Sequence, residues 1–424
     1  MMGLPAAAAA ASLGRHISPV MAMPGDGHRF VSLYFNGAWD VLLSLDPRDP
    51  ASSPAGIDLG TDDLIAGYQE PDEWTFGGAS HLIGPAMVDL QRHADVMTIF
   101  RGVNMNTVAH PTGRAYVNTW IPPAGVVPKG DSLGTRMAAG SNYEDFLLPN
   151  VSIGLPSFNH AFAPEVTGIG MGRSTDATNL VEPIATPFSS DTAALLQQAR
   201  EQSQSCIGAG YSDHPTPKVN IARERVQELL GMQLGAAFDF TSDEDIQGRY
   251  LINNPQNGAE AGVVAATIWR LLDLGLTTSI TAQLQAGLDT HDSRWATNQG
   301  PRQRTGFRSI AALLDDLRTT DPSLQNTTVI AHSEFARTPN INGRGGRDHW
   351  FANSILVFGG GLRPGVFGAT VPDTLGLTAV NLQTGLPDDA GEVIRPEHIG
   401  ATLAHARGLD YGDFRVDPLT HWIA

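Results

Sequence analysis

Short apolar runs alternate with longer amphipathic stretches along the chain, which predicts strands separated by helices. Apolar runs bounded by turn residues indicate strands at residues 30–35, 96–100, 278–284, 327–331 and 354–358. Helical spacing of apolar residues is found at residues 82–94, 191–204, 220–230, 259–274, 304–317 and 396–407. The repeated strand–helix–strand order predicts an α/β fold with a mostly parallel central sheet and helices on both faces.

Two stretches interrupt this alternation. Residues 122–187 are rich in Gly, Pro, Ser and Asn without clear periodicity, and we expect a loop-rich insertion with short strands that lines or covers a site. Residues 1–28 contain six consecutive alanines and are interpreted either as the later part of an export signal or as a disordered tail. Residues 29–424 are then expected to form one domain, and no apolar run is long enough to span a membrane.

Charge and cysteine content exclude some partners and some kinds of metal site. The net charge is −17 and no run of Lys or Arg stands out, so nucleic acid is not an expected partner. Cys206 is the only cysteine, which excludes an intramolecular disulfide and a thiolate-rich metal site. Metal ligands, if the chain has them, must therefore be histidines and carboxylates.

Acidic and imidazole side chains follow several of the predicted strands, and one further pair lies in a glycine-rich segment. These residues are Asp40, Asp289, His291, Glu334, Asp348 and His349. Because the carboxyl ends of parallel strands lie side by side, the pattern predicts a divalent-metal site holding Zn, Mn, Ca or Mg.

Most of these residues also have a simpler interpretation or a restricted role. Asp289 and His291 can be a hydrogen-bonded pair in a turn, and Glu334 can be the ion-pair partner of Arg337. Asp348 and His349 are adjacent, so in extended backbone only one of them can face an ion, and the other is expected to orient it.

Several motifs resemble a known family. They are the turn at residues 36–40, the GLDTH block at 287–291, the segments 333–339, 341–343 and 345–350, and the blocks at 363–368 and 395–410. Together they resemble the bacterial family known as domain of unknown function 1501, which is similar to the alkaline phosphatase and sulfatase superfamily. The resemblance implies that Asp40, Asp289, His291, Glu334 and either Asp348 or His349 occupy metal-ligand positions. It also implies export, often by the twin-arginine route, to the periplasm or the exterior.

The chain departs from the superfamily pattern at two positions. Phe335 follows Glu334 where the superfamily has an Asp-His pair, which favours one ion over two. Ala109 precedes His110 where family members often have a serine, so the expected nucleophilic hydroxyl is missing. Thr107 and Thr112 are nearby substitutes. Alternatively, water activated by the ion attacks directly and His110 acts as general acid or base, unless His110 is simply bonded to backbone.

Two functions are compatible with these features. The first is an exported metal-dependent hydrolase of small phosphate or sulfate esters. Its ester oxygens would be bound by Arg114, Arg337 or Arg347, unless these arginines pair with carboxylates instead. The second is an exported, non-catalytic protein that keeps the hydrolase fold and binds a metal, a glycan or a partner.

Overall fold

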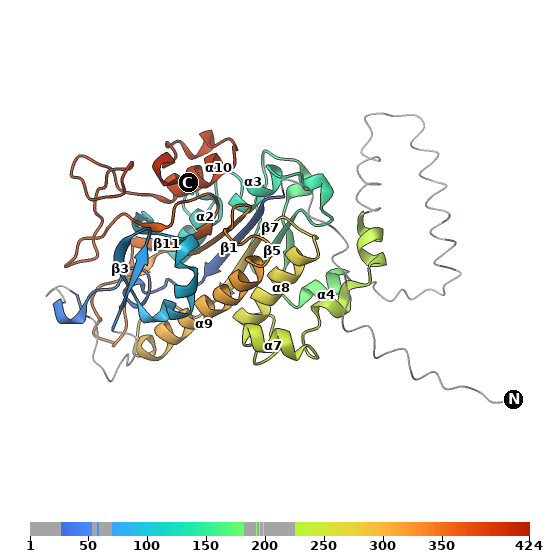
Figure 1. The fold of residues 1–424 in the computed structure, drawn as a ribbon, viewed down its shortest axis with the longest axis horizontal. Helices are drawn as coiled ribbons and strands as arrows, with labels where there is room; N and C mark the ends of the chain where they lie inside the picture. The colour runs from blue at the N-terminus through green and yellow to red at the C-terminus, as the bar shows by residue number, and fades with distance from the viewer. Residues whose placement is uncertain are drawn as a thin grey trace.

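A computed structural model describes residues 27–52, 57–58, 70–181, 192, 195, 198 and 225–424. Its centre is an eight-stranded sheet in the order β12-β4-β11-β8-β1-β7-β5-β6 (Figure 1). The strands of this sheet are β1 (Arg29–Phe35), β4 (Met97–Asn104), β5 (Asn150–Ile153), β6 (Ile169–Met171), β7 (Ser279–Gln285), β8 (Thr327–Ser333), β11 (Ala352–Gly359) and β12 (Gly365–Phe367). Two small antiparallel pairs are β2 (Asp72–Phe76) with β3 (Ala79–Ile83), and β9 (Ala336–Arg337) with β10 (His349–Trp350).

The direction of the strands confirms the predicted mostly parallel sheet. Strand β1 runs parallel to both of its neighbours, β7 and β8, and only β11 runs antiparallel to the strands beside it. Because β11 is reversed, its first residue, Ala352, pairs with Asn104 at the end of β4. One end of the sheet therefore gathers the carboxyl ends of β1, β4, β7 and β8 together with the amino end of β11.

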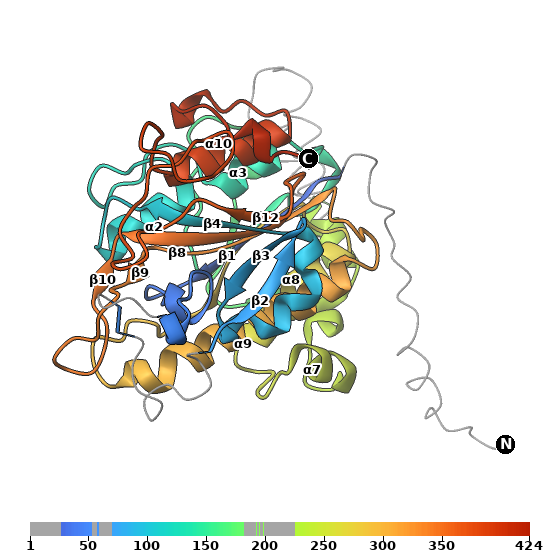
Figure 2. The same cartoon turned by 60° about the vertical axis from the view of Figure 1, so that its left-hand side comes forward.

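Helices cover both faces of the sheet, as predicted. The α-helices with described bounds are α2 (His110–Thr119), α3 (Leu133–Ala139), α4 (Asp176–Val181), α7 (Glu244–Tyr250), α8 (Ala261–Asp273), α9 (Arg294–Leu317) and α10 (Pro396–Ala406). The 3-10 helices are η1 (Val41–Leu43), η2 (Pro50–Ser52), η3 (Pro85–Val96), η4 (Tyr143–Asp145), η5 (Pro164–Val166), η6 (Leu234–Phe238), η7 (Gly412–Phe414) and η8 (Thr420–Trp422). Figure 2 shows α10, α3 and α2 above the sheet and α8 and α9 below it.

Strand β1 divides its side chains between two cores. Val31, Leu33 and Phe35 pack into the core beneath α8 and α9, whereas Phe30 and Tyr34 pack into the core beneath α2, α3 and α10. Alternate residues of a strand face opposite sides of its sheet, so a central strand covered on both sides is mostly apolar. The buried hydroxyl of Ser32 in β1 is paired with Nε2 of His332 at 2.9 Å. This requirement explains why the first apolar run was recognisable in the sequence.

The structure differs from the sequence-based expectation in three segments. Helix α2 begins at His110, where a loop was expected, and α9 begins at Arg294, ten residues before the predicted start. The supposed insertion at 122–187 supplies α3, β5 and β6, so it contributes two strands to one margin of the main sheet. The expected export segment and most of the helix expected at 191–204 lie outside the described residues. No helix among the described residues has the length and apolar character needed to cross a membrane.

Candidate metal centre

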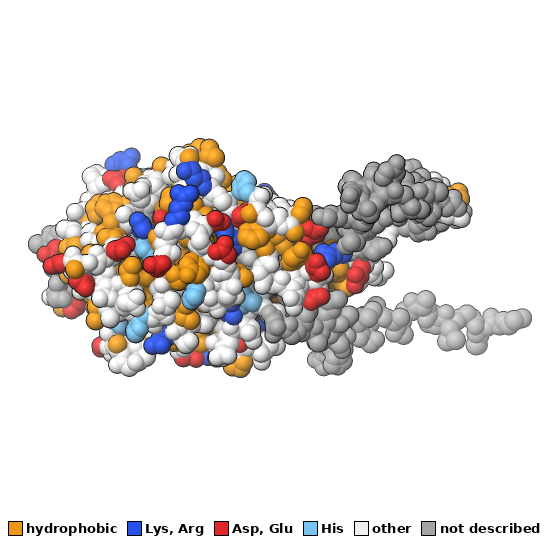
Figure 3. Space-filling model, turned by 90° about the horizontal axis from the view of Figure 1, so that it is seen from above, with side chains coloured by type: hydrophobic (Ala, Val, Ile, Leu, Met, Phe, Trp, Pro, Cys, Tyr) orange, Lys and Arg blue, Asp and Glu red, His pale blue; other side chains and the backbone are white. Residues whose placement is uncertain are grey.

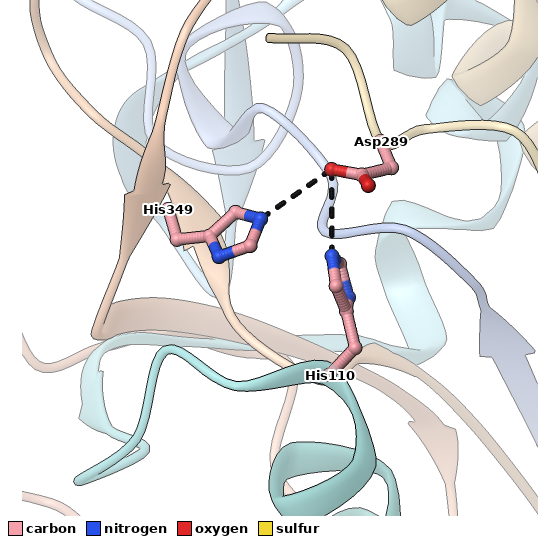
Figure 4. A group of neighbouring side chains, drawn as sticks. All are labelled: His110, Asp289 and His349. Atoms are coloured by element: carbon pink, nitrogen blue, oxygen red, sulfur yellow. Dashed lines mark hydrogen bonds and ion pairs between the residues drawn. The ribbon is translucent and has the colours of Figure 1, made fainter.

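Three histidines converge on one carboxylate at the end of the sheet described above. His110 is the first residue of α2, Asp289 and His291 lie in the loop after β7, and His349 begins β10. The Nε2 atoms of His110, His291 and His349 lie 3.4, 3.0 and 3.4 Å from Oδ1 of Asp289. Figure 4 shows how His110 and His349 approach Asp289 from separate elements.

The other nitrogen of each imidazole is held by an acceptor. The Nδ1 atoms of His110 and His291 lie 2.6 Å from Oε1 of Glu334 and 2.7 Å from Oδ1 of Asp348. Nδ1 of His349 lies 2.7 Å from the carbonyl oxygen of Val108. A carbonyl oxygen and an ionised carboxylate can only accept, so each Nδ1 is assigned a proton. In the neutral form of each ring, Nε2 then carries a lone pair.

The spacing of these lone pairs suits a bound cation. The Nε2 atoms of His291 and His349 are only 2.9 Å apart. Two lone pairs at this separation repel each other unless a proton or a metal ion lies between them. Three imidazole nitrogens with one carboxylate oxygen are a donor set that zinc and similar divalent ions accept. Ligand atoms of His110, Asp289 and His349 all lie within 4.8 Å of one another. His291 is not part of that group and approaches it through Asp289 and His349, at 3.0 and 2.9 Å.

Glu334 lies behind His110 and not beside the other histidines. Its side chain is fully buried, and its carboxylate accepts the N–H of Gly37 at 2.9 Å and lies 2.8 Å from Oγ of Ser333. Burial opposes charge on both partners, yet their hydrogen bond lowers the pKa of Glu334 and raises the pKa of His110. Gly113 permits this contact, because a Cβ there would meet the backbone oxygen of Glu334 at 2.7 Å.

Arg337 supports Asp289 from inside the protein. Its fully buried guanidinium lies 2.7 Å from Oδ1 of Asp289 and also donates to the carbonyl oxygens of Ala38 and Leu288, at 3.1 and 3.0 Å. Partial burial works against the charge of Asp289, but the Arg337 contact outweighs it and holds the pKa of Asp289 well below its ordinary value. With its N–H groups directed at protein acceptors, Arg337 is placed to support the site and not to contact a substrate.

Asp40 is engaged by protein donors. Its carboxylate is fully buried, accepts the N–H of Leu42 at 3.1 Å and the indole N–H of Trp295 at 2.7 Å, and lies 3.0 Å from Nε of Arg347. This carboxylate therefore faces Trp295 and Arg347, and the structure does not gather it with the three histidines.

Asp348 was expected to orient its neighbour His349 or to be oriented by it, but in the structure Asp348 contacts His291 instead. His349 is the member whose side chain joins the converging group, while half-exposed Asp348 orients His291 and accepts a hydrogen bond from Nδ2 of Asn342 at 3.0 Å. Phe335 packs its ring against His110 and His349, at centroid distances of 4.8 and 4.6 Å. An apolar ring thus stands where the superfamily pattern has an imidazole.

The remaining predicted site residues lie along the start of α2. Oγ1 of Thr107 accepts the N–H of Ala109 at 3.2 Å, and Thr112 lies partly buried in the first turn of the helix. Arg114, one turn after His110, donates to Oδ1 of Asn36 at 3.2 Å. Its Nε is buried and has no hydrogen-bond partner among the described residues.

Several supporting residues gave little or no signal in the sequence. Nε2 of Gln299 donates to the carbonyl oxygens of Leu288 and Ala38, and Nε2 of Gln303 donates to that of Asp40. Both glutamines are fully buried on α9 at a spacing of four residues, but the predicted helix began after them. The Val108 carbonyl left no signal at all, since every residue carries one.

Comparison with known proteins gives a family but little further structural detail. One similar solved structure is Ps i-CgsB in complex with k-i-k-neocarrahexaose. The alignment covers 93% of this chain and 75% of that chain, with 9% identity and a TM-score of 0.37. Another is a putative sulfatase from Bacteroides thetaiotaomicron, with 11% identity, 91% and 71% coverage and a TM-score of 0.32. A third is the C-terminal periplasmic domain of EcEptC from Escherichia coli in complex with Zn, with 9% identity, 80% and 77% coverage and a TM-score of 0.30.

Sequence comparison is more decisive. No curated protein sequence matches the chain significantly. The profile of the family described as "Protein of unknown function (DUF1501)" matches residues 27–422, which is nearly all of the chain. This match confirms the resemblance carried by the motifs around Asp289, Glu334 and His349, and the chain belongs to the DUF1501 family.

Proposed function

We propose that this protein is an exported metal-dependent hydrolase of small phosphate or sulfate esters. Its divalent ion is held by His110, His291, His349 and Asp289. The observation that carries the proposal is the convergence of three anchored imidazoles on one carboxylate, because fixed Nδ1 protons leave the Nε2 atoms ready to coordinate. When bound, such an ion polarises ester oxygens and stabilises the charge that develops on them.

The chain's own residues prepare this site in distinct ways. Glu334 and Asp348 fix the orientation of His110 and His291, and Arg337 keeps Asp289 ionised. Arg114 lies one turn from His110, is partly exposed and donates through Nη2 to Oδ1 of Asn36 at 3.2 Å. We therefore assign Arg114 the role of binding an oxygen of the phosphate or sulfate group.

Attack by water is the proposed form of the reaction. Ala109 has no hydroxyl, and Oγ1 of Thr107 already accepts the N–H of Ala109. Thr112 is the remaining hydroxyl in the first turn of α2, so a Thr112→Ala variant that retains activity supports attack by water. A variant that loses activity with normal metal content assigns the nucleophile to Thr112.

Export is proposed from the sequence. The alanine-rich start and the family resemblance support a periplasmic or extracellular location. When cells of the native host are fractionated, the protein is expected outside the cytoplasm. The charge of −17 argues against nucleic acid as a partner. The expected substrate, a small anionic ester, follows from the proposed metal ion, because a bound cation makes one pocket attractive to an anion.

The second function, metal or partner binding without catalysis, is favoured by Ala109 and Phe335. These two residues stand where the superfamily pattern has a hydroxyl and an imidazole. The packing of Phe335 against His110 and His349 makes the site more apolar on that side. Metal binding without turnover is what this alternative predicts.

Metal analysis and ester hydrolysis test the two functions together. The purified full chain is expected to contain divalent metal and to hydrolyse an aryl phosphate or an aryl sulfate. His349→Ala is expected to lose both properties, whereas His421→Ala, which alters an exposed histidine, is expected to keep them. Bound metal without turnover of either ester selects the non-catalytic function. A protein that binds no added divalent metal refutes the proposed centre.

A further inference from the structure

A cavity with a volume of about 560 Å³ opens beside the amino-terminal end of α10. Its lining includes Ile121, Lys129, Arg395, Glu397 and Arg415. Ile121 follows the last turn of α2, whereas His110 begins that helix, so about 15 Å of helix separates the cavity from the candidate metal centre. Figure 3 views the molecule from the α10 side, where basic and acidic side chains lie among hydrophobic ones.

A buried carboxylate lies in the wall of this cavity. The side chain of Glu397 is only 7% exposed, and its Oε2 accepts a hydrogen bond from the hydroxyl of Tyr116. Its other oxygen, Oε1, lies 3.9 Å from Nε of Arg395, which is too long for a hydrogen bond. A carboxylate so poorly exposed is stabilised by additional donors. A ligand with hydroxyl or ammonium groups in the cavity would supply them.

The cations around the cavity are available for an anion. Within the described part of the chain, Lys129 and Arg415 have no ion-pair partner, and both are exposed. The other two carboxylates of the lining are already engaged by protein groups. Asp413 lies 2.6 Å from Nη2 of Arg136, and Asp131 accepts the N–H of Ala161 at 3.2 Å. The lining thus holds three cations, Lys129, Arg395 and Arg415, and three carboxylates, so it offers partners to a ligand that carries both an anionic group and hydrogen-bond donors.

The wall that carries these groups is held in place. Arg136 is 5% exposed, and its guanidinium lies over the rings of Phe414 and Phe162, at 5.3 and 5.7 Å from their centroids. The same side chain contacts Asp413. A cavity whose wall is fixed by such contacts needs little rearrangement when a ligand enters.

We infer that this cavity binds a small organic anion that also carries hydroxyl or ammonium donors, as acidic sugars and amino acids do. The anionic group contacts Lys129 and Arg415, and the donors contact Glu397. The inference does not depend on the proposed hydrolase function, since none of these residues belongs to the metal centre.

Calorimetric titration of the full chain with glucuronate and with glutamate tests the inference, with neutral glucose as the reference ligand. At least one anion is expected to bind more tightly than glucose. In the Lys129→Gln/Arg415→Gln variant its affinity is expected to fall about tenfold or more, equivalent to about 1.4 kcal/mol. Arg308→Gln, which neutralises an exposed arginine of α9, is the matched control and is expected to bind as the wild type does.

A Glu397→Gln variant separates the two ligand types. An ammonium group loses a charged partner in this variant, so glutamate binding is expected to weaken more than glucuronate binding. His349→Ala is expected to leave binding of either anion unchanged, which separates this cavity from the metal centre. Equal affinity in the wild type and the Lys129→Gln/Arg415→Gln variant overturns the inference, as does the absence of binding by both anions at about 10 mM.

Discussion

The groups that contact the Nδ1 atoms of the three histidines determine whether the Nε2 atoms point toward a common centre. Glu334, Asp348 and the carbonyl of Val108 each hold one Nδ1, and Arg337 holds the carboxylate at which the rings converge. Since partners of this kind fix ring orientation and tautomer, their removal should weaken the site without removing a ligand.

Replacement of Glu334 by Gln is the most direct test at this scale. The amide keeps the shape of the side chain but loses the negative charge that fixes the proton on Nδ1 of His110. Metal affinity, measured by titration against a competing chelator, is expected to fall about 10- to 100-fold. Glu392→Gln, which alters a carboxylate whose side chain is 66% exposed, should bind metal as the wild type does. Unchanged affinity in Glu334→Gln would show that Glu334 does not orient His110.

Replacement of Arg337 by Met should affect stability as well. The substitution leaves several buried carbonyl oxygens without a donor and removes the counter-charge of Asp289. The free energy of unfolding in urea is expected to fall by about 3 kcal/mol. Arg344→Met changes an arginine whose side chain is 68% exposed and should cost less than about 0.5 kcal/mol. Similar unfolding midpoints for the two variants would contradict the role assigned to Arg337.

At the scale of elements, the position of α2 decides the site. The helix begins at His110, and Gly113 lets its first turn approach Glu334 closely. The sequence contained a signal for this helix, because Pro111 in the first turn is typical of a helix start. Without an apolar repeat before it, however, the segment was interpreted as a loop.

The approach of α2 to Glu334 can be tested by Gly113→Ala. The new Cβ would lie 2.7 Å from the backbone oxygen and 2.9 Å from Cβ of Glu334, so the helix must shift away. We expect a loss of about 1 to 3 kcal/mol of unfolding free energy, together with weaker metal binding in the chelator titration. Gly248→Ala in α7, where an added Cβ meets nothing within 4 Å, should be neutral or stabilising. Gly113→Ala with unaltered stability and affinity would refute the close approach.

Most elements of the sheet could be predicted because each buried strand is an apolar run. β1, β7, β8 and β11 were found within about two residues of their observed bounds. Short strands were expected between residues 122 and 187, but β5 and β6 could not be located because they are short and lie in a segment rich in Gly and Pro. The antiparallel direction of β11 was not predictable either, since an apolar run has the same pattern in both directions.

For the whole molecule, buried neutral histidines connect stability to pH. His398 accepts the N–H of Arg395 through Nδ1 at 3.1 Å, and burial, aided by the charge of Arg395, lowers the pKa of His398 to about 4. Below pH 6.5 the unfolded chain binds a proton that the folded chain does not. Stability contributed by His398 is therefore complete above pH 6.5 and is lost as the pH falls toward 4.

Thermal unfolding at several pH values can isolate this contribution. A His398→Asn variant lacks the titrating group, so its stability should decrease less than that of the wild type between pH 6.5 and 4. Over this pH range the wild type should lose up to about 3 kcal/mol more of its free energy of unfolding than the variant does. His405→Asn changes an exposed histidine of the same helix and should follow the wild type. Parallel pH profiles for His398→Asn and the wild type would refute this linkage.

The sequence by itself determined the α/β class and the family, and it placed Asp289 and His291 just after a strand of the sheet. Those features follow from local rules: apolar runs form buried strands, and residues that follow parallel strands lie at one end of a sheet. Only the tertiary structure decided which side chains face the common centre. His110 enters it because α2 packs against Glu334, whereas Asp40 faces Trp295 and Arg347 because those donors surround it. These contacts join residues more than 200 positions apart in the chain, so no local pattern could reveal them.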